Sequence, residues 1–165
     1  MAAGKNKPGE INGRPQLTQE GYDRLQERVS DIRDRRLPEM RPLLIETERD
    51  ERIVAEFERL IEEAGIIDAL LAQADVISIS ADDVAKGISL GMRAQVTLED
   101  GSKEWVRPVH PEEGFLDEER ISATSPLALA LMGASAGDTV MVKAPTGEWP
   151  CKVLAISLDG VLADA

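Results

Sequence analysis

The feature that most constrains this chain is a run of seven apolar residues spaced alternately four and three positions apart. The run comprises Ile53, Phe57, Leu60, Ala64, Ile67, Leu71 and Ala74. This is the spacing of the a and d positions of a coiled coil, and glutamates and arginines occupy the other faces. A helix with such a stripe has to bury it against a second helix.

A shorter stripe of the same kind precedes it. Tyr22, Leu25, Val29 and Ile32 are spaced three, four and three residues apart, and the phase is then lost at Arg36. Leu37, Met40 and Leu44 resume the spacing in a shifted phase. Proline costs about 3 kcal/mol in a helix interior, so Pro38 and Pro42 predict a kink or a short break over residues 37–42.

The two stripes together predict an antiparallel coiled-coil hairpin over residues 16–77. Thr18 is a suitable N-cap for the first helix. The turn has to lie within residues 45–52, where Thr47 or Asp50 could cap the second helix.

The second half of the chain has period-2 alternation instead. Strands are predicted at 93–98, 104–109, 139–142 and 149–156, with a short helix over 127–132. The fold class is therefore α+β, with a small antiparallel sheet domain over 92–158. We expect a disordered tail over 1–15, a linker over 78–91 and a tail over 159–165.

Composition excludes several kinds of function. The net charge of −12 disfavours independent binding of nucleic-acid phosphates, and 3% aromatic residues leave little for base stacking. With one cysteine, Cys151, and one histidine, His110, a disulfide, a thiolate zinc site and a His-rich metal site are excluded. No apolar run approaches 18 residues and no secretory signal is recognisable, so we expect a cytoplasmic protein that does not bind membranes and has no cofactor of its own.

Four stretches give the chain a family resemblance. They are Leu17–Leu25, Gln73–Ile77, the strand Gly91–Asp100, which ends in V-x-L-E-D, and residues 122–138, with S-x-x-S-P-x-x-x-A-L-x-G-x-x-x-G-D. In this order and spacing they resemble the bacterial Gre transcript-cleavage factors, over residues 16 to 157.

The resemblance implies an FKBP-like sheet domain and a role as a regulator of RNA polymerase rather than an enzyme. Members dock this domain on the rim of the polymerase secondary channel, where the matching loop here is Thr124, Ser125 and Pro126. Their coiled coil enters the channel, and acidic residues at its tip help to hold a second Mg²⁺ in the polymerase active site. The polymerase then cleaves its own transcript. The resemblance implies a monomer that meets the nascent RNA 3′ end only indirectly.

The tip departs from the family pattern, D-L-x-E-N-A-E-Y. Asp50 matches, but Ile53 stands for the second acid and Val54 for the asparagine. Glu46, Glu48 and Glu51 lie close by in the sequence. Three interpretations stay open: a solvated acidic helix end, Mg²⁺ ligation by Asp50 in the polymerase complex, and a polymerase contact without metal.

The second helix is also about one heptad shorter than in cleavage-competent members, which would withdraw the tip by ~10 Å. Metal ligation tolerates only a few tenths of an ångström. We therefore expect binding in the channel without efficient cleavage. The alternatives are a cleavage factor that uses Asp50, and a coiled-coil module for another protein partner.

Two further sets of residues have two interpretations each. Arg33, Arg35 and Arg36 could face RNA, as a basic patch does in the cleavage factors, but their alternation with Asp31 and Asp34 is typical of a salt-bridged solvent face. Ser and Thr before Pro126 could dock on polymerase or simply cap the short helix.

Overall fold

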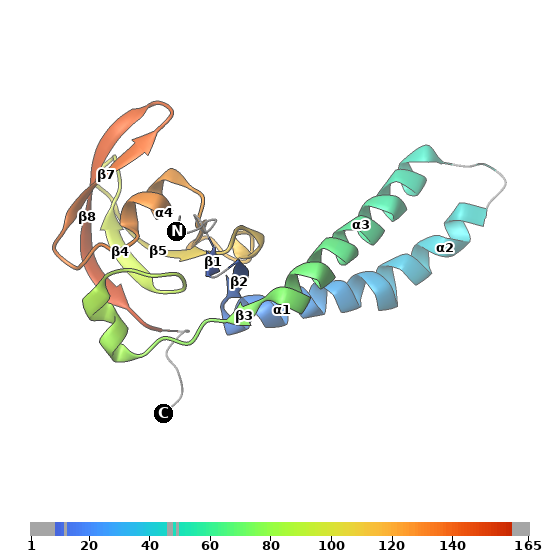
Figure 1. Cartoon of the computed structure of the whole chain (residues 1–165). Coiled ribbons are helices and arrows are strands. Elements are labelled where there is room, and N and C mark those ends of the chain that lie inside the picture. Colours follow the sequence, from blue (N-terminus) through green and yellow to red (C-terminus); the bar gives the residue numbers. More distant parts are fainter. Residues whose placement is uncertain (1–8, 12, 46–47, 49, 160–165) are drawn as a thin grey trace, which may run out of the picture. The chain divides into compact units, whose positions relative to one another are not determined.

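The computed structural model describes residues 9–11, 13–45, 48 and 50–159. The chain divides into two compact units (Figure 1). The helical unit is Tyr22–Ala74, and the sheet unit combines Met1–Gly21 with Asp75–Ala165. A helical part and a β domain were expected, but the boundaries differ from 16–77 and 92–158, because the residues flanking the helices belong to the sheet unit.

The helical unit consists of two arms. The first arm is α1 (Gln19–Asp31), the π-helical turn η1 (Ile32–Arg36) and α2 (Leu37–Ile45), and the second is α3 (Glu51–Gln73). Both η1 and α2 contact α3. Arg28 pairs with Glu63 and, further along the first arm, Arg36 pairs with Glu56, so the arms run in opposite directions.

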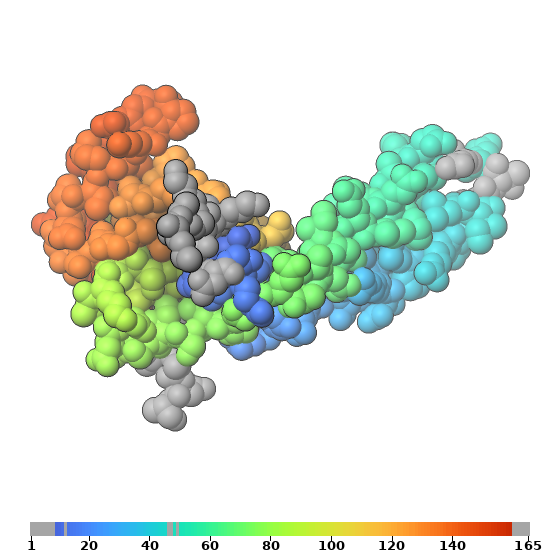
Figure 2. Space-filling view, viewed as in Figure 1, coloured from blue at the N-terminus to red at the C-terminus, as the bar shows by residue number. Residues whose placement is uncertain are grey.

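The predicted apolar stripes form the buried faces of these arms. The first arm buries Leu25, Val29, Ile32 and Leu37, and α3 buries Leu60, Ala64 and Ile67. Figure 2 shows the side chains of the two arms in contact. Among the described residues, no helix combines the length and apolarity that crossing a membrane requires.

The η1 turn explains why the first stripe changes phase. The backbone N–H of Leu37 bonds to the carbonyl of Ile32, five residues earlier, so the turn contains one extra residue. Leu37 thereby reaches the buried face where residue 36 would otherwise lie.

The kink predicted over 37–42 was therefore misplaced, since α2 continues through both prolines. Pro38 is the second residue of α2, a position whose N–H needs no partner within that helix. Pro42 lies inside α2 and is exposed.

The larger sheet of the sheet unit has the strand order β6-β5-β4-β8-β7. The strands are β4 (Arg93–Thr97), β5 (Lys103–Val109), β6 (Arg120–Ser122), β7 (Thr139–Ala144) and β8 (Gly147–Ser157). The helix α4 (Pro126–Leu131) contacts β7. The core contains Ile88, Val96, Val106, Leu131, Val142, Cys151 and Val153.

The prediction of a wholly antiparallel sheet was wrong at one strand. Neighbours are antiparallel except β5 and β6, which pair in parallel. The chain leaves β5 through the 3₁₀ turn η3 (Pro111–Glu113) and a loop before β6 begins, and this detour lets β6 enter in the same direction as β5.

A second, small sheet corrects the expectation of a disordered tail over 1–15. The described residues of that segment form β1 (Glu10–Ile11) and the start of β2 (Arg14–Leu17), and β2 pairs in parallel with β3 (Asp75–Val76). These strands form because residues 15–17 are buried, Leu17 completely. Residues 1–8, 12 and 160–165, which complete the two predicted tails, lie outside the described residues.

The predicted linker over 78–91 is also part of the folded sheet unit. It contains the 3₁₀ helix η2 (Ala81–Lys86), and it buries Ile79, Ile88 and Leu90. Gly87 has φ +92°, and a Cβ there would lie 2.2 Å from the carbonyl oxygen of Gly133. The segment therefore packs too closely to serve as a spacer.

Candidate functional site

The tip of the helical unit is organised by Asp50, which caps α3. Its Oδ1 accepts a hydrogen bond from the backbone N–H of Arg52 at 2.9 Å, and its Oδ2 lies 3.3 Å from Nη2 of the same residue. The hydrogen bonds from the Arg52 backbone and side chain lower the pKa of Asp50. The predicted cap is confirmed, and this carboxylate is ionised and engaged within its own helix end.

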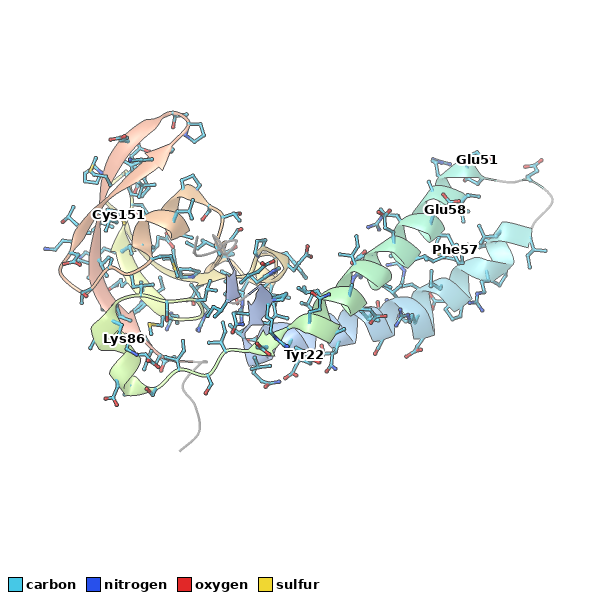
Figure 3. All side chains as sticks on the ribbon, in the orientation of Figure 1. Tyr22, Glu51, Phe57, Glu58, Lys86 and Cys151 are labelled. Carbon is cyan, nitrogen blue, oxygen red and sulfur yellow. The ribbon has the colours of Figure 1, made fainter. Side chains whose placement is uncertain are left out.

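The described acidic residues of the tip do not form a group of three that could hold a metal ion. Glu48 and Glu51 are exposed, and Figure 3 shows Glu51 at the start of α3. Ile53, at the position of the family's second acid, is half-buried. Glu46 and Thr47 lie outside the described residues. Acidic side chains at a helix N-terminus are favourable for electrostatic reasons alone.

The described donor groups at the tip do not by themselves fit a metal ion. Within residues 9–11, 13–45, 48 and 50–159, no group of three His, Cys, Asp or Glu side chains could hold one. Mg²⁺ prefers six oxygen ligands in near-octahedral geometry, and Asp50 already accepts bonds from Arg52. A Mg²⁺ ion at this tip would need most of its ligands from another molecule.

The three arginines offered as an RNA-facing patch all have acidic partners within the helical unit. Arg33 pairs with Asp68. Arg35 pairs with Asp31 at 2.6 Å, and Arg36 lies 3.5 Å from Glu56. The salt-bridged interpretation describes this surface, since each guanidinium has a carboxylate from the same unit.

The loop predicted to dock on polymerase, residues 124–126, forms the capped N-terminus of helix α4. Ser125 Oγ accepts a hydrogen bond from the Ala128 N–H at 3.2 Å, and Pro126 is the first residue of α4. The hydroxyls of Ser122 and Thr124 are 2.7 Å apart. Thr124 and Pro126 are exposed, so capping leaves these two side chains accessible to a partner.

The most completely buried polar group among the described residues was missed by the sequence reasoning. Glu113 in η3 is fully buried and accepts hydrogen bonds from both the backbone N–H and the hydroxyl of Thr18. Thr18 in turn accepts from the Gly21 N–H at 3.0 Å, which confirms it as the cap of α1. Burial raises the pKa of Glu113, although the bonds from Thr18 oppose this shift.

Arg120 supplies the charge that faces Glu113. Its side chain is 4% exposed and contacts Asp117, Glu20 at 3.0 Å and Glu113 at 3.8 Å. Its Nε is buried without a hydrogen-bond partner. Thr18, Glu20 and Gly21 belong to the sheet unit, so this cluster holds the start of α1 within that unit. In the sequence, Glu113 lies in an acidic segment that is typical of a solvent-exposed loop. Its partner Thr18 is 95 residues away, so no local pattern indicates the pair.

The single histidine also has a structural role. His110 caps η3, because its Nδ1 accepts from the Glu112 N–H at 3.1 Å, and burial lowers its pKa. Cys151 is fully buried in the core of the larger sheet, as expected of a small apolar residue.

Comparisons with known proteins place this geometry in a family. Residues 85–158 match the family described as "Transcription elongation factor, GreA/GreB, C-term". The chain is 30% identical over 154 residues to the transcription elongation factor GreA of Thermotoga sp. (strain RQ2), covering 85% of this chain and 95% of the relative. It is 28% identical over 160 residues to GreA of Nitratidesulfovibrio vulgaris, covering 87% and 95%.

Among solved structures, the chain is similar to GreA factor homolog 1 (Gfh1) of Thermus thermophilus, at 26% identity over 86% of this chain and 97% of that one, with a TM-score of 0.37. The chain belongs to the GreA/GreB family of transcription elongation factors.

Proposed function

We propose that this elongation factor binds bacterial RNA polymerase at the secondary channel and modulates elongation without efficient stimulation of transcript cleavage. The arms of the helical unit would form the antiparallel coiled coil that enters the channel. The sheet unit, with the FKBP-like fold that the family resemblance implies, would dock on the channel rim through Thr124, Ser125 and Pro126. The protein regulates polymerase and is not an enzyme by itself.

The observation that carries this proposal is the state of Asp50. Asp50, which matches the first acid of the family's tip pattern, caps its own helix and pairs with Arg52. The position of the second acid holds Ile53, whose side chain has no oxygen to offer a cation. Entry of the arms into the channel requires no metal ligand, whereas metal ligation requires carboxylate oxygens that are free to bind a cation.

The arm length supports the same conclusion. The second arm has 23 residues, or roughly 34 Å at 1.5 Å per residue. From the family resemblance, we expect the corresponding helix of a cleavage factor to be about one heptad longer. A shorter arm can still fill a channel, but a ~10 Å displacement of the tip exceeds the tolerance of metal coordination.

The experiment is transcript cleavage in a backtracked elongation complex with Mg²⁺, comparing the wild-type chain with Asp50→Ala. Glu58→Ala is the matched control, because Glu58 is an exposed acid further along α3 (Figure 3). We expect no stimulation by any of the three proteins. We also expect the wild-type chain to suppress cleavage by an authentic GreA added afterwards.

Stimulation that is lost in Asp50→Ala and kept in Glu58→Ala would contradict the proposal. It would establish the alternative, in which Asp50 helps to hold a Mg²⁺ ion shared with polymerase. The exposed Glu48 and the 39% exposure of the Asp50 side chain are what favour that alternative.

A different class of function, a helical module for another protein partner, is favoured by apolar residues near the tip. Ile45 is 84% exposed and Leu43 is 40% exposed. A chain that failed to bind polymerase and whose mass rose with concentration would support this class. The proposed function predicts a monomer, because the stripe of each arm is already buried against the other.

A further inference from the structure

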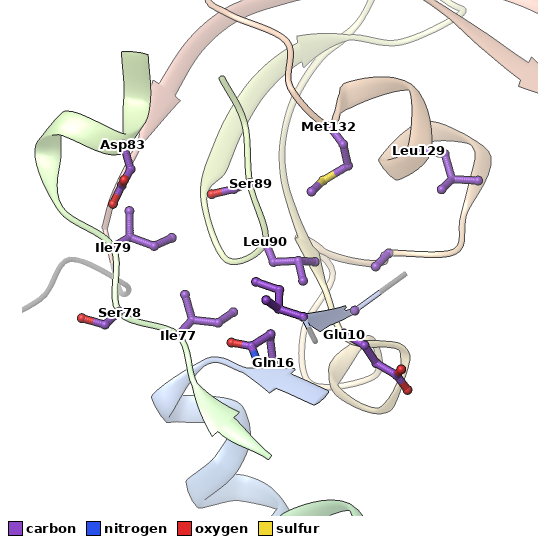
Figure 4. A pocket seen from close by; sticks show the side chains of 13 residues that line it. Glu10, Gln16, Ile77, Ser78, Ile79, Asp83, Ser89, Leu90, Leu129 and Met132 are labelled. Atoms are coloured by element: carbon purple, nitrogen blue, oxygen red, sulfur yellow. The ribbon is translucent and has the colours of Figure 1, made fainter. Parts of the chain in front are cut away.

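The sheet unit contains an open apolar groove of about 430 Å³ that no part of the proposed mechanism uses. It lies between β1, the segment that follows β3, and α4 (Figure 4). Its apolar lining includes Ile11, Ile77, Ile79, Leu90, Leu129 and Met132. In Figure 4, Ile77 and Ile79 flank the hollow on one side, and Leu129 and Met132 flank it on the other.

Three large apolar side chains at the rim of this groove are exposed. Ile11 is 54% exposed, Leu129 55% and Met132 39%. Apolar side chains gathered around a groove with polar edges are typical of surfaces that bind another molecule. Ile11 is far from Leu129 and Met132 in the sequence, so the convergence of these side chains is a property of the fold.

The charged residues that line the groove are both acidic. Glu10 and Asp83 contribute to the lining, and no Lys or Arg does so among the described residues. Asp83 accepts a hydrogen bond from the Ser80 N–H at 2.8 Å, which lowers its pKa and keeps it ionised. Lys86 lies 3.4 Å from Asp83 and offsets part of this charge, while the whole chain has a net charge of −12.

The groove adjoins the loop proposed to dock on polymerase. Ala123 lines the groove and directly precedes Thr124. Leu129 lines this groove and also a smaller hollow that includes Pro126 and Met141. A partner seated on the loop would therefore lie next to the groove.

We propose that this groove binds a segment of RNA polymerase that inserts a large aliphatic or aromatic side chain beside a lysine or arginine. The apolar side chain would cover Ile11, Leu129 and Met132, and the cation would lie near Glu10 and Asp83. This inference rests on the proposed function, since it gives the chemistry of the polymerase segment that the sheet unit meets.

The test measures the affinity of the full chain for purified RNA polymerase. Ile11→Ser and Met132→Ser each remove an exposed apolar contact without emptying the core, and each should weaken binding about tenfold. Phe115→Ser is the matched control, because Phe115 is 66% exposed in the sheet unit but lines neither this groove nor the hollow beside Pro126. Glu10→Lys should weaken binding several-fold, and the exposed Glu148→Lys should not.

A photo-crosslinking residue at position 132 then identifies the segment itself. We expect a polymerase peptide in which an apolar residue neighbours a lysine or arginine. Wild-type affinity in both serine variants, or a crosslinked peptide without a basic residue, would overturn this inference and leave the proposed function standing. A wild-type chain that does not bind polymerase would overturn both.

Discussion

Gly21 lies against the carboxylate of Glu113 so closely that a Cβ there would be 1.9 Å from Oε1. Gly21→Ala should therefore destabilise the fold by about 1–3 kcal/mol, because the fully buried Glu113 has no room to retreat. Chemical denaturation monitored by circular dichroism measures this change.

Gly65→Ala is the control for helix propensity. Gly65 is inside α3, and a methyl group added there would have no side chain or distant backbone within 4 Å. Alanine there should stabilise the chain by about 0.5–1 kcal/mol. If Gly21→Ala were also stabilising, the tight packing of Glu113 against α1 would be refuted.

Glu113 also predicts a pH dependence of stability. Burial raises its pKa above the ordinary 4.5, so the folded chain retains the proton to a higher pH than the unfolded chain. The resulting stabilisation is complete below the unfolded pKa and is lost as the pH rises through the folded pKa. In the Glu113→Gln variant, residue 113 cannot ionise, so the variant does not lose this stabilisation as the pH rises. The free energy of unfolding of the wild type should therefore fall relative to the variant as the pH rises. A constant difference across this range would contradict the assignment.

Among single residues, the sequence predicted the groups whose partners are close along the chain. Thr18, Asp50 and Ser125 were recognised as caps because each bonds to a backbone N–H two or three residues ahead. Glu113 was not recognised, because its two strongest partners belong to Thr18, which only the tertiary fold brings near.

The η1 turn makes a prediction about the first helical arm. Its extra residue moves Leu37 onto the buried face, so deleting the exposed Asp34 should let an ordinary α-helix present the same apolar residues. We expect the deletion variant to keep its helix content and to unfold at an equal or higher temperature, measured by circular dichroism.

Deleting the exposed Gln26 is the control, because α1 has no extra residue to lose. Every later apolar residue of the first arm would rotate away from α3, so we expect a large loss of thermal stability. Equal behaviour of the two deletions would mean that η1 does not set the phase of the stripe.

The arginines of the first arm give a second prediction for that arm. Charge reversal of Arg33 and Arg36 to Glu removes the pairs with Asp68 and Glu56 and places like charges together. We expect a loss of roughly 1–2 kcal/mol in unfolding free energy for these partly exposed pairs. RNA crosslinking in an elongation complex should not change. A loss of crosslinking with unchanged stability would instead restore the RNA-facing interpretation.

Elements with a strong period were predictable, and those held by distant pairing were not. The stripe from Ile53 to Ala74 predicted α3 nearly to its ends, and the alternation in the second half predicted β4, β5, β7 and β8. By contrast, β1, β2 and β6 have two to four residues each. Such short strands exist because each pairs with another strand: β1 with β2, β2 with β3, and β6 with β5. No local sequence pattern encodes the position of the pairing strand.

Over the full chain, the two units hold two separable parts of the proposed function. The capped loop before α4 is in the sheet unit, and the Asp50 tip is in the helical unit. If the loop supplies affinity and the tip determines what happens in the channel, substitutions in the two units should change different measured quantities.

This separation can be tested by titrating variants against cleavage stimulated by an authentic GreA. Thr124→Lys alters an exposed loop side chain that does not cap α4, so the concentration needed for half-suppression should rise about tenfold while suppression at saturation stays complete. Arg52→Gln removes the side-chain pair with Asp50 but keeps the backbone bond. The concentration needed for half-suppression should therefore stay at the wild-type value. Any effect of this substitution should appear only in the extent of suppression at saturating concentration. The reverse pattern would mean that the tip provides the binding energy, and the assignment of docking to the sheet unit would then be wrong.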